Sequence, residues 1–422
     1  MNTPLDQWKS AVERGDVASV RALFEQYGEL AEMVNAQVFA FDSSAIFASR
    51  DNLEMVDLLL KHGADINAKT GWEAGGFGIL EGIDPHLAKP LIERGALVDI
   101  WAAVSLDDMA RARELIEQDP DLVIAAGGDG VHPLHYARSV PMVEFLIEKG
   151  ANINARCLDH GSTALQYLVQ DQSVVRCLLK HGAEPDVFMA AYWGDASLLE
   201  ASLAADASCC DALMGTGEWT HLGKGDIYNW KIGHDVTPAQ VARSRGHNDI
   251  AVQILQLSSP AAQLRDAIWG SHEAVVSSLI NEHPNAVSDL IKCDSTAMCR
   301  AAWENNVGAV EILLQLGFDP HKTGVHDSTP LDRAAFHGYT GVVELLLERD
   351  PNPPLLQKNE FGGTPLGACL FGLNNGWDTG HKRDHVGSVR LLIKAGSEVT
   401  NWMIGAGNAE TDLLIKEHLS KD

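Results

Sequence analysis

The chain has 422 residues, of which 45% are hydrophobic and 21% charged, a composition typical of a folded protein and not of a disordered one. Its 58 acidic residues outnumber the 32 basic ones, which gives a formal net charge of −26. A surface this acidic repels phosphate backbones and anionic lipids, and no window approaches the roughly 20 uninterrupted apolar residues of a membrane span. Nucleic acids and membranes are therefore not expected as partners.

The first residues, MNTPLDQWKSAVERGD, have neither a basic start nor an apolar run, so no secretory signal is expected. The seven cysteines are odd in number and form no CxxC pair of the kind that binds zinc. Reduced thiols in a cytoplasm fit this usage best. Neither a metal nor a cofactor is expected.

One phrase recurs along the chain at the end of a predicted helix. It reads LLKHGADINA at 59–68, LIERGALVD at 91–99, LIEKGANINA at 146–155, LLKHGAEPD at 178–186, LLQLGFDPH at 313–321 and LLIKAGSEV at 391–399. Its glycines lie 32 residues apart, from Gly63 to Gly95 and again from Gly150 to Gly182. Such a period predicts stacked helix pairs, each of which needs its neighbours to bury an apolar face.

A second phrase marks helix starts, as HPLHYARS (132–139), TPAQVARSRGH (237–247), TPLDRAAFHGY (329–339) and TPLGACLFG (364–372). Thr329 can cap its helix while Pro330 takes the first turn, where no N–H is needed. Together the two phrases resemble the ankyrin repeat in period and motif. The resemblance implies an all-α repeat solenoid of helix-turn-helix units with hairpin fingers and a concave inner groove.

The chain is expected to begin with capping helices at 1–40, to continue as the repeat solenoid over 41–399, and to close with capping helices at 400–422. The predicted units run approximately over 41–70, 71–99, 100–130, 131–161, 162–186, 187–236, 237–260, 261–295, 296–328, 329–363 and 364–399. The phrase pattern breaks down at 71–130 and 258–295, so the register of the repeats stays open there.

One long segment occupies the place of a finger, from about Met214 to Val236. It contains GEWTHLGKGDIYNWKIGHD at 217–235, in which glycines surround alternating apolar residues. This predicts an enlarged β-hairpin-like insert, which could serve as a lid over the inner groove. Its candidate ligand-binding residues are Trp219, His221, Tyr228, Trp230 and His234. A second irregular insert at 373–387 carries Trp377, Asp378, His381, Asp384 and His385.

Further candidates are assigned from the resemblance, on the fingers and at the position of each first helix that faces the groove. The fingers carry Asp129, His132, Asp159, His160, Asp294, His326, Asp327 and Glu360, and the groove position is held by Tyr136, Tyr167, Asp266, Arg300 and Arg333. Side chains of these types are typical of recognition surfaces. The finger aspartates could equally make turn hydrogen bonds, and His135 is expected to bond the backbone of a neighbouring finger.

Two classes of function remain open. In the first, the concave groove binds a partner protein, a peptide or a small organic molecule, as ankyrin arrays typically do. In the second, the scaffold carries an enzyme of hydrolase or lyase type, whose acid and base groups are drawn from His132, Asp159, His160, His326 and Asp327. The sequence contains no HExxH, GxSxG or P-loop spacing that would favour the enzyme.

The sequence also resembles a group of bacterial ankyrin proteins. The shared phrases are HGST at 160–163, FGGTPLG at 361–367 and GW…TG at 376–380. This likeness implies that the finger and insert residues form one site, and that the aromatic, polar groove receives a small organic molecule.

Overall fold

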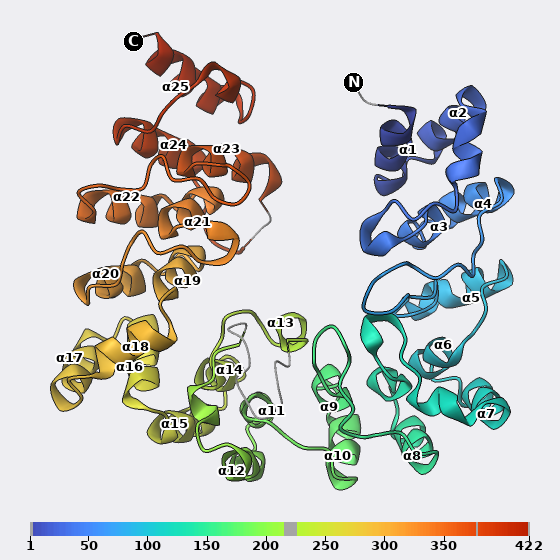
Figure 1. The fold of residues 1–422 in the computed structure, drawn as a ribbon. Helices are drawn as coiled ribbons and strands as arrows, with labels where there is room; N and C mark the ends of the chain where they lie inside the picture. Colours follow the sequence, from blue (N-terminus) through green and yellow to red (C-terminus); the bar gives the residue numbers. More distant parts are fainter. Residues whose placement is uncertain (1–2, 215–225, 377–378, 421–422) are drawn as a thin grey trace. The chain divides into compact units, whose positions relative to one another are not determined.

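A computed structural model gives the fold (Figure 1) and describes residues 3–214, 226–376 and 379–420. Over these residues the chain is helical, and its extended pairing consists of two isolated bridges, Phe39 with Ser43 and Arg156 with Thr163. The chain divides into two units, which we term unit 1 (Met1–Ile250) and unit 2 (Ala251–Asp422). Of the helices in the three ranges, none has the length and apolar content that crossing a membrane requires.

Unit 1 consists of short helices that pair along the chain. They are α1 (Pro4–Glu13), α2 (Val17–Gln26), α3 (Ala45–Ala48), α4 (Leu53–Lys61), α5 (Pro85–Glu93), α6 (Ile100–Ser105), α7 (Met109–Gln118), α8 (Val140–Glu148), α9 (Ala164–Tyr167), α10 (Gln172–Lys180), α11 (Val187–Trp193), α12 (Ala196–Ala205), α13 (Tyr228–Lys231) and α14 (Pro238–Ser244). Helix α15 (Asn248–Leu257) continues into unit 2.

Short 3-10 turns connect the helices of unit 1. They are η1 (Gly28–Met33), η2 (Ala40–Asp42), η3 (Pro120–Ile124), η4 (Gly128–Gly130), η5 (Pro133–Tyr136) and η6 (Cys209–Asp211). One of them, η4, lies where the finger around Asp129 was expected. The phrase HPLHYARS forms the 3-10 turn η5, and the next helix along the chain is α8.

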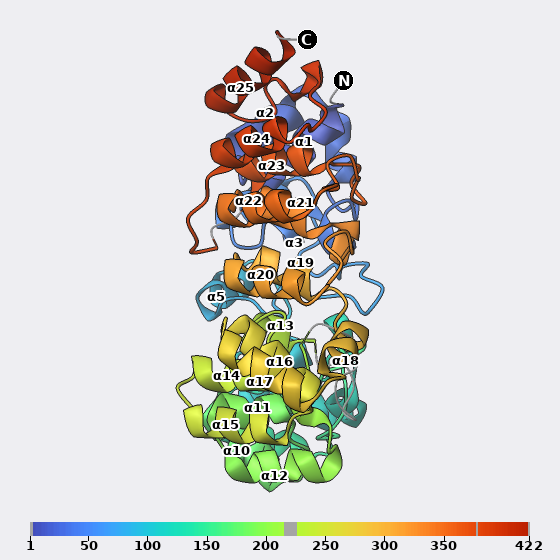
Figure 2. The ribbon, with the colours of Figure 1, turned by 90° about the vertical axis from the view of Figure 1, so that its left-hand side faces the viewer.

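Unit 2 has the same organisation. Its helices are α16 (Pro260–Trp269), α17 (Glu273–Glu282), α18 (Ala286–Cys293), α19 (Ala297–Trp303), α20 (Val307–Gln315), α21 (Pro330–His337), α22 (Thr340–Arg349), α23 (Pro365–Asn375), α24 (His385–Lys394) and α25 (Ala409–Leu419), with the 3-10 turns η7 (Val325–Asp327) and η8 (Asn401–Met403). Figure 2 shows the pairs α19–α20, α21–α22 and α23–α24 stacked in chain order.

Helix starts follow the capping chemistry that the repeated phrase predicts. The Thr329 side chain accepts a hydrogen bond from the backbone N–H of Asp332, whose carboxylate in turn accepts from the N–H of Thr329. Thr237 makes the same reciprocal capping box with Gln240. In both helices a proline follows in the first turn, where its missing N–H removes no hydrogen bond.

Apolar faces of neighbouring helix pairs form the core of each unit. In unit 2, Leu313 of α20, Val343 of α22 and Leu392 of α24 are fully buried in one hydrophobic cluster. In unit 1, Trp8 and Leu59 are likewise fully buried in a cluster. Each helix pair thus completes the burial of the next, as the repeat period predicts.

The expected enlarged β-hairpin is not seen. Residues 226–236 form the short helix α13 and turns, while 215–225 lie outside the residues that the structure describes. The physical reason is that Tyr228, at the start of α13, is fully buried and its hydroxyl donates to Oδ2 of Asp186 at 3.0 Å. The finger expected around Asp294 is also replaced, because helix α18 runs directly up to it.

Backbone hydrogen bonds join the tips of neighbouring fingers. The Asp42 carbonyl accepts from Gly71 N–H at 2.8 Å, and the Asp129 carbonyl accepts from Leu158 N–H at 3.0 Å. In unit 2 the His326 carbonyl accepts from Glu360 N–H at 3.1 Å. Each tip therefore positions the next one along the chain.

Glycines allow the fingers of unit 1 to approach one another closely. A Cβ atom on Gly128 would lie 2.2 Å from the ring of Phe77, and one on Gly75 would lie 2.2 Å from the carbonyl oxygen of Gly127. Neither distance is compatible with van der Waals packing. The segment around Phe77 can thus rest against the turn at 127–130 only because these positions lack side chains.

We predict that Gly128→Ala destabilises the protein by about 2 kcal/mol, because the added methyl group must displace the Phe77 ring. The measurement is urea unfolding followed by circular dichroism. Gly28→Ala is the control, since a Cβ there has open space around it and should change stability by less than ~0.5 kcal/mol. Equal unfolding midpoints for the two variants would contradict the close approach of these fingers.

Candidate binding surface at the finger tips

Six side chains of unit 1 form one continuous row, which we term the tip row: Phe41, Trp72, Asp129, Asp159, His160 and Trp230. The rings of Phe41 and Trp72 meet edge to face with centroids 5.5 Å apart. The indole N–H of Trp72 donates to Oδ1 of Asp129 at 3.0 Å. His160 Nε2 lies 3.6 Å from a carboxylate oxygen of both Asp129 and Asp159, and its ring centroid is 5.0 Å from that of Trp230.

Apolar side chains at these tips are exposed to solvent. Phe41 is 53% exposed, Trp230 65%, and Leu158, which precedes Asp159, 71%. A cluster of exposed large apolar residues marks an interaction surface more often than isolated ones do. The tips of unit 1 therefore have the character of a docking surface.

Phe41 is also held in an unusual backbone conformation. Its φ of 59° lies in the left-handed region, which is rare for a bulky residue. Such an outlier costs on the order of 1 kcal/mol and is found preferentially at functional positions. The neighbouring bonds that fix the tip, among them the Asp42 carbonyl to Gly71 N–H, hold the Phe41 ring toward Trp72.

The charges of the row act on the pKa of His160. The side chain of Asp129 raises its pKa above the ordinary value, with further contributions from the charges of Asp159 and Asp226, against an opposing effect of burial. The adjacent carboxylates thus favour the protonated form of the ring more than water does around an isolated histidine. Histidines paired with a carboxylate in this way also occur as general bases, so the acid–base role expected for Asp159 and His160 stays a prediction.

The same three residues could in principle hold a metal ion. Asp129, Asp159 and His160 each offer one ligand atom, and these atoms lie within 4.8 Å of one another. The oxygen and imidazole donors are of the kind that divalent transition metals accept. A metal would have to displace the proton that the carboxylates stabilise on His160, so the donor set alone does not define a metal site.

Behind the tip row lies a buried carboxylate that the sequence did not single out. Glu81 is 2% exposed, and its Oε2 accepts the N–H of Gly128, next to Asp129, at 3.2 Å. Burial, and secondarily the charge of Asp99, raises the pKa of Glu81 to about 7. Arg50 donates to the backbone carbonyl of Glu81 at 3.0 Å, which holds this segment in place.

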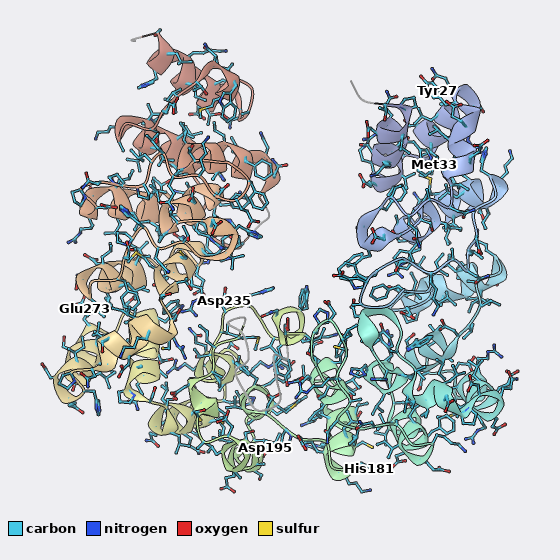
Figure 3. All side chains as sticks on the ribbon, in the orientation of Figure 1. Tyr27, Met33, His181, Asp195, Asp235 and Glu273 are labelled. Carbon is cyan, nitrogen blue, oxygen red and sulfur yellow. The ribbon has the colours of Figure 1, made fainter. Side chains whose placement is uncertain are left out.

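The described part of the insert packs on the finger at 157–163. Asp226 N–H donates to the His160 carbonyl at 3.3 Å, and Ile227 N–H donates to Oγ of Ser162 at 3.3 Å. Trp230 and His234 lie together at the surface, with ring centroids 6.0 Å apart. Figure 3 labels Asp235, the residue after His234, which marks this part of the chain. Trp219 and His221 lie outside the described residues.

Several predicted residues of unit 1 have other surroundings. Tyr228 was expected to face a ligand, but its burial against Asp186 makes it part of the core. Burial raises the pKa of both Tyr136 and Tyr167, although the Tyr167 ring lies beside that of His160, with centroids 6.2 Å apart. A ring nitrogen of His132 lies 2.8 Å from the Ile124 carbonyl, away from the tip row.

His135 makes the contact that the motif predicts, since its Nε2 lies 3.1 Å from the carbonyl oxygen of Ser162. Its ring also meets that of Tyr167 edge to face at 5.1 Å. Burial lowers the pKa of His135 to about 4, so its ring is neutral at physiological pH. The residue serves the packing of neighbouring fingers.

In unit 2, His326 pairs with Glu360, with Nδ1 and Oε1 2.5 Å apart, and its ring lies 5.1 Å from that of Phe361. Phe361 is 75% exposed, and both His326 and Asp327 have positive φ. The tips of unit 2 thus repeat the combination of charge and exposed apolar surface. None of these unit 2 residues belongs to the tip row.

The groove-facing positions of unit 2 are more buried than expected. Arg300 is 7% exposed because its guanidinium lies 4.3 Å from the centre of the Trp269 ring and 2.6 Å from Oδ2 of Asp294. Asp266 is also 7% exposed. Arg333 lies over the Trp303 ring at 4.8 Å and donates to the Val325 carbonyl at 2.7 Å.

The second insert is fixed by structural contacts. Asp384 caps α24 by accepting from Gly387 N–H at 2.7 Å, and a ring nitrogen of His385 lies 3.0 Å from the Phe336 carbonyl. The ring of His381 meets that of Tyr339 edge to face at 5.8 Å. Trp377 and Asp378 lie outside the described residues.

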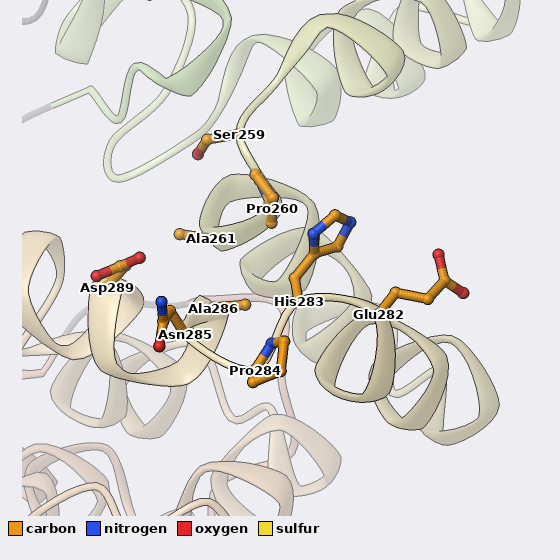
Figure 4. A pocket seen from close by; sticks show the side chains of 9 residues that line it. All are labelled: Ser259, Pro260, Ala261, Glu282, His283, Pro284, Asn285, Ala286 and Asp289. Carbon is orange, nitrogen blue, oxygen red and sulfur yellow. The ribbon is translucent and has the colours of Figure 1, made fainter.

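Two surface hollows lie away from the predicted site residues. One, of about 330 Å³, lies in unit 2 between the start of α16 and the α17–α18 turn, and Figure 4 shows His283 and Asp289 in its lining. The other, of about 600 Å³, lies in unit 1 and is lined by residues that include Arg14, Asp51 and Asn52. Neither hollow is lined by a described residue of the insert.

Comparison with known families identifies the repeats. The family described as "Ankyrin repeats (3 copies)" matches residues 100–189 and 261–359, and the family described as "Ankyrin repeat" matches residues 45–71. Together the matches span about half of the chain and fall in both units. The chain is an ankyrin-repeat protein. Of the tip row, Asp129, Asp159 and His160 lie within the matched residues.

Two curated proteins share part of this ankyrin array. "Ankyrin repeat and SAM domain-containing protein 6" of Rattus norvegicus is 33% identical over 91 residues, and the protein of the same name from Mus musculus is 32% identical over 91 residues. Each alignment covers 20% of this chain and 10% of the relative. Both relatives are mammalian, so they leave the resemblance to bacterial ankyrin proteins as a prediction.

We predict that Glu81→Gln raises stability at pH 8 by ~3 kcal/mol and has little effect at pH 4.5. The folded state raises the pKa of Glu81 from 4.5 to about 7, so the wild-type protein loses stability as pH rises through this window. Glutamine keeps the acceptor for Gly128 N–H and does not titrate. The measurement is urea unfolding of both proteins from pH 4.5 to 8, and a constant difference between them would contradict the shifted pKa.

Proposed function

We propose that this ankyrin-repeat protein is an interaction scaffold whose tip row docks an extended segment of a partner protein. The observation that carries the proposal is the continuous line of contacts from Phe41 to Trp230, which runs from one finger to the next across unit 1. Such a line suits a ligand that runs across several repeats.

The exposure of apolar side chains supports docking. Phe41, Leu158 and Trp230 leave more than half of their surface in solvent, which is unfavourable unless a partner covers it. Aromatic residues in particular dominate the energetics of protein interfaces. The left-handed Phe41 adds support, because the fold accepts backbone strain there to present an aromatic ring.

A lidded pocket for a small organic molecule has less support. Tyr228 of the proposed lid is part of the core, and the two hollows described above are lined by other residues. The enzyme alternative has no support from a catalytic sequence motif such as HExxH, GxSxG or a P-loop. An extended docking surface accounts better for the exposed tips.

We predict that the double variant Leu158→Ser/Trp230→Ala loses its partners. The tagged full chain is used to capture proteins from extract of the source cells, and bound proteins are quantified by mass spectrometry. Partners retained by the wild type should fall by roughly tenfold or more, as expected when apolar anchors are removed from an interface. The melting temperature should stay within about 2 °C, because both side chains are largely exposed.

Leu97→Ser provides a matched control, since Leu97 is 69% exposed in unit 1 and lies outside the tip row. Its partners should equal those of the wild type. The proposal is wrong if the double variant keeps its partners, or if the wild type captures none at a stoichiometric level.

A further inference from the structure

We infer that the tip row selects a basic partner segment, with an arginine or lysine side chain held against the carboxylates of Asp129 and Asp159 and flanked by the indoles of Trp72 and Trp230. This inference rests on the docking function proposed above and names the chemistry of the partner. It is carried by the charges of the row, by the placement of its rings, and by two equivalent contacts elsewhere in the chain.

The charges around the row favour a cation. Asp129 and Asp159 face His160, and Asp226 adds a third negative charge that acts on the same ring. These three carboxylates outnumber the single positive charge that the His160 ring can carry, so the group keeps a negative balance. The side chain of Asp159 is 38% exposed, so a partner can reach its carboxylate. The net charge of −26 attracts a basic segment from a distance.

Arg156 belongs to the same finger as Asp159 and precedes it by three residues. Its guanidinium donates to the carbonyl oxygen of Gly161, within the same finger. The carboxylate of Asp159 has the salt bridge with His160. The positive charge of Arg156 reduces the negative balance of the finger but leaves the carboxylate of Asp159 accessible to a partner.

The aromatic rings flank the carboxylates. Trp72 directs its N–H edge at Asp129, and Trp230 packs beside His160 while remaining 65% exposed. Indole faces attract ammonium and guanidinium groups, and the attraction is greatest for tryptophan. A side chain that reaches the carboxylates would therefore pass beside the exposed Trp230 ring, whose face favours a cation.

The chain makes the same kind of contact with its own basic residues. Lys69 Nζ lies 4.4 Å from the centre of the Trp101 ring and 3.7 Å from Oδ2 of Asp99. In unit 2, Arg300 lies between the Trp269 ring and the carboxylate of Asp294. In each case a tryptophan and an aspartate hold one cation. The tip row offers these two groups at an exposed position.

The test uses the full chain and fluorescently labelled peptides of glycine and serine that carry arginine, lysine or glutamate at every third position. Binding is followed by fluorescence anisotropy at low and physiological salt. We predict that the arginine and lysine peptides bind, that the glutamate peptide does not, and that affinity falls with salt. Asp129→Asn/Asp159→Asn should weaken binding of the basic peptides by roughly tenfold.

Asparagine retains an acceptor for the Trp72 N–H and tolerates the left-handed backbone at position 129, so the double variant should fold. The control is Glu25→Gln/Glu29→Gln, which changes the net charge equally at exposed positions outside the row. It should leave affinity within about twofold, since distant surface charges are screened.

Three outcomes overturn the inference: equal binding of basic and acidic peptides, full affinity of the Asp129→Asn/Asp159→Asn variant, or equal losses in that variant and in the control. If any of these occurs while Leu158→Ser/Trp230→Ala still loses its cellular partners, the docking function stands and only the selection of a basic segment is wrong. Retained partners in that variant would instead reject the docking function itself.

Discussion

Burial of each helix pair against the next is the interaction on which the structure depends. Helices of nine or ten residues, such as α20 and α22, are too short to be stable alone in water. Leu313, Val343 and Leu392 become fully buried only because consecutive pairs share one cluster, and each buried leucine contributes on the order of 2 kcal/mol. The helices therefore form only as part of an array.

Because the stacked helices supply the core, the side chains of the fingers are available for recognition. Their backbone is fixed by bonds from tip to tip, such as Asp129 carbonyl to Leu158 N–H, while side chains such as that of Trp230 remain outside the core. A rigid scaffold with exposed, variable loops is the arrangement in which binding residues are commonly found. The tip row follows from the stacking beneath it, because the helix pairs set the spacing of the fingers.

Helix starts could be predicted because they depend on residues adjacent in the sequence. The predictions that failed concern residues whose positions depend on contacts distant in the sequence. Thr329 with Pro330 marks a helix start through neighbouring atoms, and the sequence phrase was sufficient to find it. The insert was read as a hairpin, but Tyr228 forms a buried bond with Asp186, a partner 42 residues away. Arg300 was placed in the groove, yet Trp269 and Asp294 cover it.

Predictability of the candidate site was similarly uneven. Asp159, His160 and Trp230 stood out as polar or aromatic residues near a finger, and the structure places them together. Phe41, Trp72 and Glu81 were missed, because the segments at 40–42 and 70–83 have no helical period and their roles depend on contacts between separate fingers. Glycines clustered around aromatic residues, as in GWEAGGFG, are the signal that marks such a close approach.

The left-handed tips have an evolutionary consequence. Asp42, Asp129, His326 and Asp327 all have positive φ, a conformation that asparagine, aspartate, histidine and glycine adopt more readily than other residues. Substitution at these positions is therefore tolerated mainly among these four residue types. Divergence in what such a protein recognises should accumulate at neighbouring positions with ordinary backbone, such as 158 and 159, where exchanges other than to proline keep the N–H groups that bond the Asp129 carbonyl.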